Sequence, residues 1–229
     1  MYNGHYEIAR LLLERGAHPN AEVESSADAL SVAIRRGDER MVELLCSYGA
    51  SRRVHLLAYY GDVRTAAAVF AANPALADNT EALAHAAEEG HEGFVRLMLR
   101  YQPDLAKRVS VGARKEIAEL LFAHGMDPSR PNWLRITPLH RFAKKGEIEN
   151  AALFIDHGAD LDARDEEMRS TPLGYAAKFG HEEMVALLLR RGANASLPDD
   201  PPWATPLAWA TRRGHKGIVK MLRAHAAQK

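Results

Sequence analysis

The tripeptide Thr-Pro-Leu recurs in this chain at a fixed spacing, and no other feature constrains the fold as strongly. It begins at Thr137, Thr171 and Thr205, so each step is 34 residues long. A period of this size is the sequence signature of a repeat array. In such an array each unit is too small to bury its own apolar face, and it packs against the next copy.

Residues 171–192, TPLGYAAKFGHEEMVALLLRRG, show what one copy is expected to form. Thr171 can cap a helix through its hydroxyl group, and Pro172 suits the first helical position because its missing N–H needs no partner there. Gly180 can end that helix in a left-handed conformation. The leucine-rich segment that follows predicts a second helix, which stops at Gly192. The sequence therefore predicts a pair of short helices in each copy.

The motifs T-P-L-H, G-H, L-L and G-A-D or G-A-N recur at matching offsets, and with them the chain resembles the ankyrin-repeat family. The resemblance covers essentially the whole chain. It implies an all-α ankyrin-repeat solenoid of stacked helix-turn-helix units with short β-turn fingers. We expect one continuous domain over residues 1–229. It starts with a partial repeat at 1–20, and the further repeats lie at about 21–50, 51–77, 78–102, 103–127, 128–160, 161–194 and 195–229.

Several copies depart from the pattern. Gly4-His5 has the motif that lies between two helices, so the chain begins inside a repeat. We favour a piece of a longer protein over an orphan helix that serves as a cap. Two repeats are short, with 24 residues from Gly37 to Gly61 and 22 from Gly90 to Gly112, and both are expected to lack only the finger. Asn73-Pro74 replaces a glycine stop, and we expect Asn73 to be left-handed.

Composition restricts the class of protein. The formal net charge is zero and the only cysteine is Cys46, so we expect neither a disulfide framework nor a zinc site. We find no membrane-length apolar run and no secretory signal, and we expect an intracellular, cytoplasmic location. Arginine pairs are dispersed and balanced by acids, which argues against nucleic acid. Nucleotide-binding and catalytic motifs are absent as well. We therefore expect a non-enzymatic chain without catalytic residues, cofactor or metal.

Two groups of polar residues have a structural interpretation. The chain has eleven histidines, and most occupy motif positions, for example His91, His181 and His215 after the inter-helix glycine and His140 in TPLH. In the family such histidines make structural hydrogen bonds. The run Asp165-Glu166-Glu167 is expected to be a solvated finger tip.

The resemblance implies a concave groove, lined by the fingers and the first helices, that binds partner proteins. Pairs that precede the inter-helix glycines, such as Lys144-Lys145 and Arg212-Arg213, are expected to face it. Arg141, Tyr175 and Trp209 form a ladder, each five residues before its glycine. For Tyr175 and Trp209, packing against neighbouring repeats stays an equal alternative. The residues expected to contact the partner are Trp133, Arg141, Lys145, Tyr175, Lys178, Phe179, Trp203, Trp209, Arg213 and Tyr60.

We thus expect a scaffold or adaptor that binds a protein or peptide, acidic and with apolar anchors, and that is itself a monomer. Two alternatives remain open. The array is the targeting arm of a larger enzyme or effector, or its fingerless middle section holds a small ligand. In either case the fold alone does not give the function.

Overall fold

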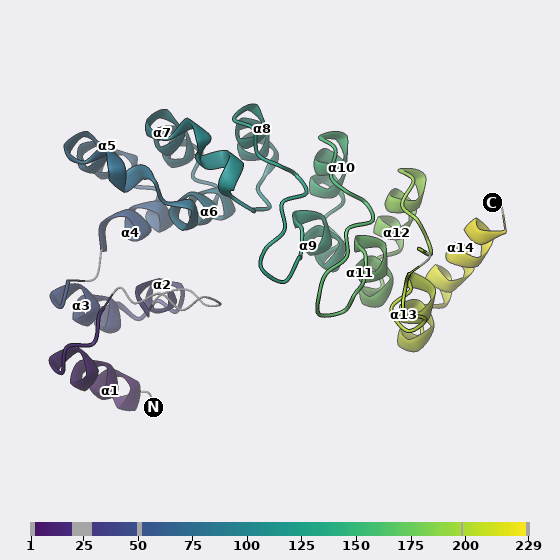
Figure 1. Cartoon of the computed structure of the whole chain (residues 1–229), viewed down its shortest axis with the longest axis horizontal. Coiled ribbons are helices and arrows are strands. Elements are labelled where there is room, and N and C mark those ends of the chain that lie inside the picture. Colours follow the sequence, from purple (N-terminus) through teal and green to yellow (C-terminus); the bar gives the residue numbers. More distant parts are fainter. Residues whose placement is uncertain (1–2, 20–28, 50–51, 198, 228–229) are drawn as a thin grey trace. The chain divides into compact units, whose positions relative to one another are not determined.

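The computed structural model describes residues 3–19, 29–49, 52–197 and 199–227, which form helices and loops only (Figure 1). This part of the chain contains fourteen α-helices, two short 3₁₀ helices and no β-strand, which confirms the all-α prediction. The chain divides into two compact units, residues 1–102 and 103–229. Each unit is described by itself, and one continuous domain stays a prediction.

The unit of residues 103–229 contains the regular repeats. Its elements are η2 (Pro103–Arg108), α8 (Lys115–Ala123), α9 (Pro138–Lys145), α10 (Ile148–Asp156), α11 (Pro172–Phe179), α12 (Glu182–Arg190), α13 (Pro206–Arg213) and α14 (Lys216–Ala226). The first helices α9, α11 and α13 pack side by side (Figure 1). The second helices α10, α12 and α14 form a separate layer behind them.

The ends of the first helices follow the sequence pattern. The Thr171 hydroxyl oxygen accepts the Gly174 N–H at 3.3 Å, and Thr205 accepts the Ala208 N–H at 3.2 Å. Proline is the first helical residue in all three copies. Gly180 ends α11 with a φ of +83°, in the left-handed region where a side chain is strained. The predicted caps and glycine stops are therefore confirmed here.

Histidines after the inter-helix glycines join successive repeats. The Nε2 atom of His181 lies 2.9 Å from the carbonyl oxygen of Lys144, and that of His215 lies 3.2 Å from the carbonyl oxygen of Lys178. In the other unit, His91 makes the same contact with Tyr59 at 2.8 Å. These bonds confirm the structural interpretation of the three histidines.

His140 has a different structural role, inside the repeat that begins at Thr137. Its Nδ1 atom accepts the Thr137 backbone N–H at 3.2 Å, so Nε2 carries the proton and donates to the Ser170 carbonyl oxygen at 3.1 Å. The ring thus closes the cap of α9 and holds the next finger at the same time.

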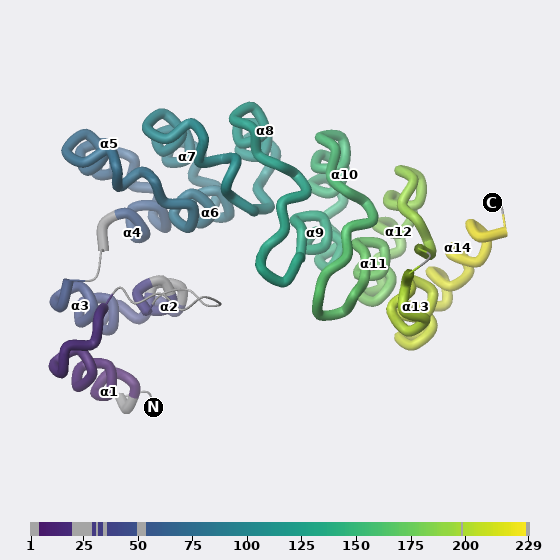
Figure 2. Tube along the Cα trace, viewed as in Figure 1, coloured from purple at the N-terminus to yellow at the C-terminus, as the bar shows by residue number. Residues whose placement is uncertain are grey.

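The long loops before α9, α11 and α13 are the fingers, seen in Figure 2 as excursions of the chain beside these helices. The first finger closes on Asn132, whose side-chain oxygen accepts the N–H groups of Leu134 at 3.0 Å and Ile136 at 2.9 Å. Side-chain-to-backbone bonds thus hold the first finger, whose described residues form no strand.

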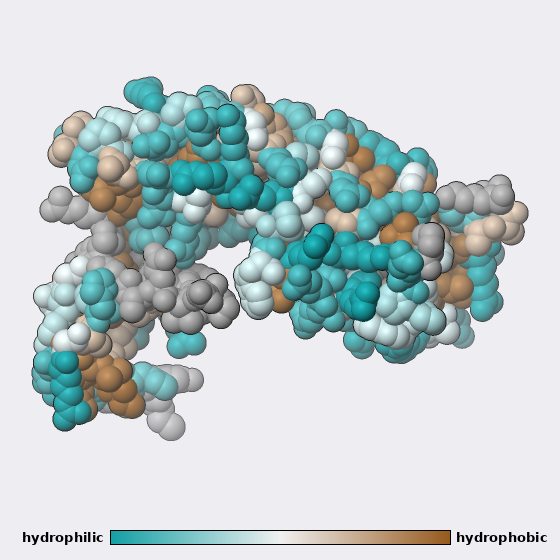
Figure 3. Space-filling model, viewed as in Figure 1, coloured by the Kyte–Doolittle hydropathy of each residue, from teal (hydrophilic) through white to brown (hydrophobic). Residues whose placement is uncertain are grey.

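The unit of residues 1–102 contains α1 (Asn3–Glu14), α2 (Ala29–Arg35), α3 (Glu39–Ser47), α4 (Arg52–Tyr60), α5 (Val63–Ala72), η1 (Pro74–Ala77), α6 (Thr80–Glu89) and α7 (Glu92–Tyr101). On α1, the apolar side chains of Ile8, Leu11 and Leu12 are 44–58% exposed, and apolar surface is visible over this helix in Figure 3.

The short repeats differ from the prediction in two ways. Asn73 is not left-handed: its φ is −146°, and its side chain accepts the Ala75 N–H, so it ends α5 and begins η1. In the repeat at 103–127 the first α-helix is missing as well as the finger. The 3₁₀ helix η2 replaces it, and the following Val109-Ser110-Val111 segment favours extended backbone. Gly112 accordingly lacks the positive φ of the other inter-helix glycines.

Candidate functional site

Cationic and aromatic side chains gather at the C-terminal ends of the first helices α9, α11 and α13. Lys144 and Lys145 are exposed at the end of α9, and Arg212 and Arg213 at the end of α13. At the end of α11, Lys178 is half-buried and Phe179 is 40% exposed. Cations in the last turn are favoured by the partial negative charge at a helix C-terminus.

These side chains contact one another in an alternating order, which we call the cation–aromatic row: Lys144, Phe179, Lys178, Trp209 and Arg212. Both Lys144 Nζ and Lys178 Nζ lie 5.6 Å from the centre of the Phe179 ring. Lys178 Nζ is also 4.5 Å from the Trp209 ring, and the Arg212 guanidinium carbon is 4.8 Å from the same ring. These distances allow cation–π attraction, so the row links three repeats.

The cations of the row lack direct ion pairs. Lys144, Lys178 and Arg212 form no ion pair within 4 Å with any residue that the structure describes, whereas Lys145 pairs with Glu147 at 3.5 Å. Burial lowers the pKa of Lys178 and the charge of Arg213 lowers it further, against the opposing effect of the Glu167 and Asp165 carboxylates. A bound anion would offset the repulsion between the cations.

Charge is also unevenly divided along the sequence. Residues 103–229 contain 20 Lys and Arg against 16 Asp and Glu, a net charge of +4. Residues 1–102 contain 10 against 14, a net charge of −4. The cation–aromatic row therefore lies in the basic unit.

Tryptophans of two fingers were predicted as contacts, and both are exposed. Trp133 in the first finger is 64% exposed, and Trp203 in the third is 44% exposed. Trp203 lies against Trp209, edge to face, with 6.3 Å between ring centres. Arg212 donates from its guanidinium group to the Trp203 carbonyl oxygen at 3.4 Å, which fixes this finger beside the row.

Tyr175 and Trp209 were predicted as exposed contacts, but both are buried. Tyr175 is 5% exposed, because its ring packs edge to face on His140 with 5.0 Å between centres. Burial raises the pKa of the Tyr175 hydroxyl, and the neighbouring Asp165 carboxylate, which is hydrogen-bonded to it, raises it further. Trp209 is 8% exposed beneath Lys178, Arg212 and Trp203. Neither ring is open to a partner. This agrees with the alternative expectation, in which both rings pack against neighbouring repeats.

Asp165 was predicted to be solvated and is instead buried, with 2% exposure, whereas Glu166 and Glu167 are exposed as predicted. Its carboxylate accepts the backbone N–H groups of Met168 at 2.7 Å and Ser170 at 2.9 Å. These bonds close the second finger as Asn132 closes the first. A buried carboxylate that satisfies backbone donors is a structural group.

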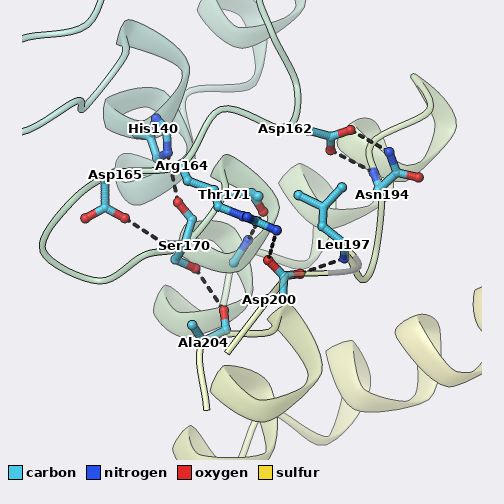
Figure 4. A network of polar contacts seen from close by, with 11 residues as sticks. His140, Asp162, Arg164, Asp165, Ser170, Thr171, Asn194, Leu197, Asp200 and Ala204 are labelled. Atoms are coloured by element: carbon cyan, nitrogen blue, oxygen red, sulfur yellow. Dashed lines mark hydrogen bonds and ion pairs between the residues drawn. The ribbon is translucent and has the colours of Figure 1, made fainter. Parts of the chain in front are cut away.

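Further polar contacts join the second and third fingers (Figure 4). The Ser170 hydroxyl donates to the Ala204 carbonyl oxygen at 3.1 Å, and Arg164 pairs with the nearly buried Asp200 at 2.7 Å. Asp162 accepts two bonds from Asn194. Met168, in the second finger, also contacts the Lys178 ammonium group. Ser170 and Ala204 are one period apart, whereas the Arg164–Asp200 and Asp162–Asn194 contacts join non-equivalent positions that no periodic signal in the sequence indicates.

Arg141 and Tyr60, which were also predicted to contact the partner, lie apart from the row. Arg141 is half-buried, and its guanidinium group reaches the Ser110 carbonyl oxygen at 3.5 Å. Tyr60 is 65% exposed at the end of α4, in the unit of residues 1–102, with Tyr59 edge to face at 5.1 Å. The structure thus brings Lys178, Phe179 and Trp209 together, with Arg213 and Lys145 at the same helix ends.

The described residues contain no group of three or more His, Cys, Asp or Glu side chains placed to hold a metal ion. None of their helices combines the length and the apolar character needed to cross a lipid bilayer.

Stacked helix pairs joined by projecting fingers define a helical repeat solenoid. The family model of ankyrin repeats in three copies matches residues 105–199 and 171–229, and the model of a single ankyrin repeat matches residues 1–22. The chain belongs to the ankyrin-repeat family, whose arrays are generally protein–protein interaction modules and typically non-enzymatic. Comparison with curated proteins gives no match.

Proposed function

We propose that this chain is a non-enzymatic adaptor, and that its unit of residues 103–229 binds an acidic segment of a partner protein. The observation that carries the proposal is the cation–aromatic row, whose cations form no direct ion pair among the described residues. Lys145 and Arg213 extend the positive surface at the same helix ends.

In this proposal, charged and apolar side chains contribute to partner binding in different ways. Exposed cations attract an acidic segment and select against basic partners, but each exposed pair adds little affinity. Affinity comes from a few anchors in well-packed places, and aromatic residues are enriched among them. Phe179, Trp203 and Trp133 are the exposed aromatic side chains of this unit. The partner is therefore expected to combine acidic residues with apolar side chains.

The test measures binding of the purified chain to a fluorescent peptide of Glu-Glu-Phe repeats, with a Gln-Gln-Phe peptide as the neutral counterpart. The variant K144E/K145E/R213E reverses three exposed charges, that of Lys144 in the row and those of Lys145 and Arg213 beside it. We expect it to bind the acidic peptide at least about tenfold more weakly, because three attractive contacts become repulsive.

The control variant, K216E/K220E/R223E, makes the same change in net charge on exposed positions of α14. We expect it to retain the peptide. Equal losses in the two variants would show that only net charge matters, and the proposed surface would be wrong. Binding of a single-stranded oligonucleotide to the same surface with equal affinity would also contradict a protein partner.

A second candidate function follows from a cavity in the other unit. An open, mainly apolar cavity of about 680 Å³ lies between α4, α5 and η1, lined by Leu56, Val69, Ala72 and Leu76 among others. The cavity lies in the section without regular fingers. For this section the sequence left small-ligand binding open as an alternative to the adaptor function. A thermal-shift screen with small apolar compounds tests it, and a Val69→Asp variant should abolish any stabilisation. If no compound raises the melting temperature, this candidate is discarded.

A further inference from the structure

The indole N–H of Trp209 is a buried donor at the centre of the basic surface. No acceptor among the described residues lies within hydrogen-bonding distance of its Nε1 atom, which is itself buried. The Trp209 residue as a whole is only 8% exposed. A buried donor without a partner costs about 1–3 kcal/mol, so native proteins rarely keep one without a reason.

Two cations lie over the ring that carries this donor. Lys178 lies over the Trp209 ring at 4.5 Å and Arg212 at 4.8 Å, and neither forms a direct ion pair in the described part of the chain, although the Glu167 and Asp165 carboxylates act on the Lys178 charge from farther away. The polar contacts of these two cations are weak ones, to the Met168 sulfur and, at 3.4 Å, to the Trp203 carbonyl oxygen. A carboxylate would gain charge-assisted bonds here, which are stronger than neutral ones.

Trp203, in the third finger, packs against Trp209. Its ring meets the Trp209 ring edge to face at 6.3 Å and is 44% exposed, so part of it already faces solvent. An exposed side chain changes its rotamer at little cost. A ligand that displaces this ring would reach the buried indole edge.

We propose that one acidic side chain of the partner is an anchor at this place. Its carboxylate enters between Lys178 and Arg212, displaces the Trp203 ring and accepts the N–H of Trp209. The site takes a carboxylate rather than an amide, because two cations and one N–H donor offer hydrogens and no acceptor. This inference rests on the proposed function and specifies the chemistry of one contact in it.

The test follows the three tryptophan indole N–H signals of the chain in ¹H–¹⁵N spectra, assigned by single Trp→Phe variants. The probe is the peptide of Glu-Glu-Phe repeats, with the Gln-Gln-Phe peptide as control. We expect the Trp209 indole proton to move downfield with the acidic peptide only, because it gains a charged acceptor. The Trp203 signal should change in the same titration.

Two variants complete the test. Trp209→Phe keeps an aromatic ring under both cations but lacks the N–H, and we expect Kd to rise about tenfold, as for one lost bond to a charged group. Lys178→Gln leaves Trp209 in place, so the downfield movement can still be read and should become smaller. Circular dichroism confirms that both variants stay folded.

The possible failures are distinguishable. If the acidic peptide binds the wild-type chain but the Trp209 signal stays and Trp209→Phe binds equally well, the carboxylate anchor is wrong and the proposed function stands. If the acidic peptide does not bind at all, both fall together.

Discussion

Gly180 and Gly192 have the same backbone conformation but different neighbours. Their φ angles are +83° and +96°. A Cβ atom on Gly180 would lie 2.8 Å from the Cε1 atom of His215, whereas one on Gly192 would meet nothing within 4 Å. The two positions therefore separate backbone strain from steric conflict.

We predict that Gly192→Ala lowers the free energy of unfolding by about 1 kcal/mol, the cost of a left-handed alanine. Gly180→Ala should lower it by about 1 kcal/mol more, because the His215 ring must move and its bond to the Lys178 carbonyl oxygen is lost. Urea unfolding of both variants gives the comparison. Equal losses would mean that the histidine contact adds nothing to stability.

His140 makes stability depend on pH. Burial lowers its pKa from the ordinary 6.5, against smaller opposing effects of the Ser170 carbonyl and Asp165. Above pH 6.5 the imidazole is neutral in both the folded and the unfolded chain, so its contribution is fully present. As pH falls below 6.5, the unfolded chain takes up a proton that the folded chain resists, and stability is lost.

We predict that His140→Gln has a shallower decline of unfolding free energy below pH 6.5 than the wild-type chain. The difference between the two proteins grows as pH falls, because the folded wild-type chain resists a proton that its unfolded chain takes up. Urea titrations on both sides of that pH measure it. The same slope in the two proteins would assign the pH dependence to other groups.

At the scale of elements, arginine–aspartate pairs join neighbouring repeats in two different settings. The Arg164–Asp200 pair is largely buried, with side-chain exposures of 28% and 6%. Asp200 also accepts the Leu197 N–H at 2.7 Å. The Arg191–Asp156 pair joins α10 to the end of α12 and is exposed, at 36% and 59%.

We predict that Asp200→Ala costs about 2–3 kcal/mol, since it leaves Arg164 half-buried without its partner and removes a bond within the third finger. Asp156→Ala, the matched exposed case, should cost less than about 1 kcal/mol. Thermal unfolding compares the two. In addition, hydrogen exchange of residues 199–204 should accelerate only in the Asp200 variant; unchanged exchange there would contradict a brace between fingers.

At the scale of the whole molecule, the two units differ in how their repeats are joined. In residues 103–229, histidines and finger contacts connect successive repeats. In residues 1–102, His91 makes such a bond to Tyr59, but Asp38 and Asp62 take the position of the histidine in the two preceding repeats. Each of these aspartates accepts an N–H of its own helix, from Met41 and Thr65 at 3.0 Å, instead of reaching the preceding repeat. The open cavity beside α4 and α5 removes further packing.

We predict that backbone amides of α4 and α5 exchange with deuterium faster than those of α11 and α12. Stability of a repeat array is roughly a sum of repeat and interface contributions, so weaker interfaces open first. Hydrogen-exchange mass spectrometry on the intact chain checks this order. Uniform protection along the array would contradict it.

Local and periodic features of this chain could be predicted from its sequence. Thr171, Pro172 and Gly180 act within one helix, and His181 recurs with the period, so their types and spacing give their roles. Of the candidate surface, the exposed side chains of Phe179, Trp133 and Trp203 were predictable in the same way.

Only the tertiary structure decided which of the remaining residues are covered. Tyr175 and Trp209 hold the same place in their helices as the half-buried Arg141, yet both are buried. The side chains that bury these two rings lie at non-equivalent positions, in the fingers and at the helix ends. Asp165 likewise became buried because it collects the backbone donors of its own loop and the Tyr175 hydroxyl. Periodicity predicts contacts between equivalent positions, whereas burial depends on every side chain that comes to lie above a residue.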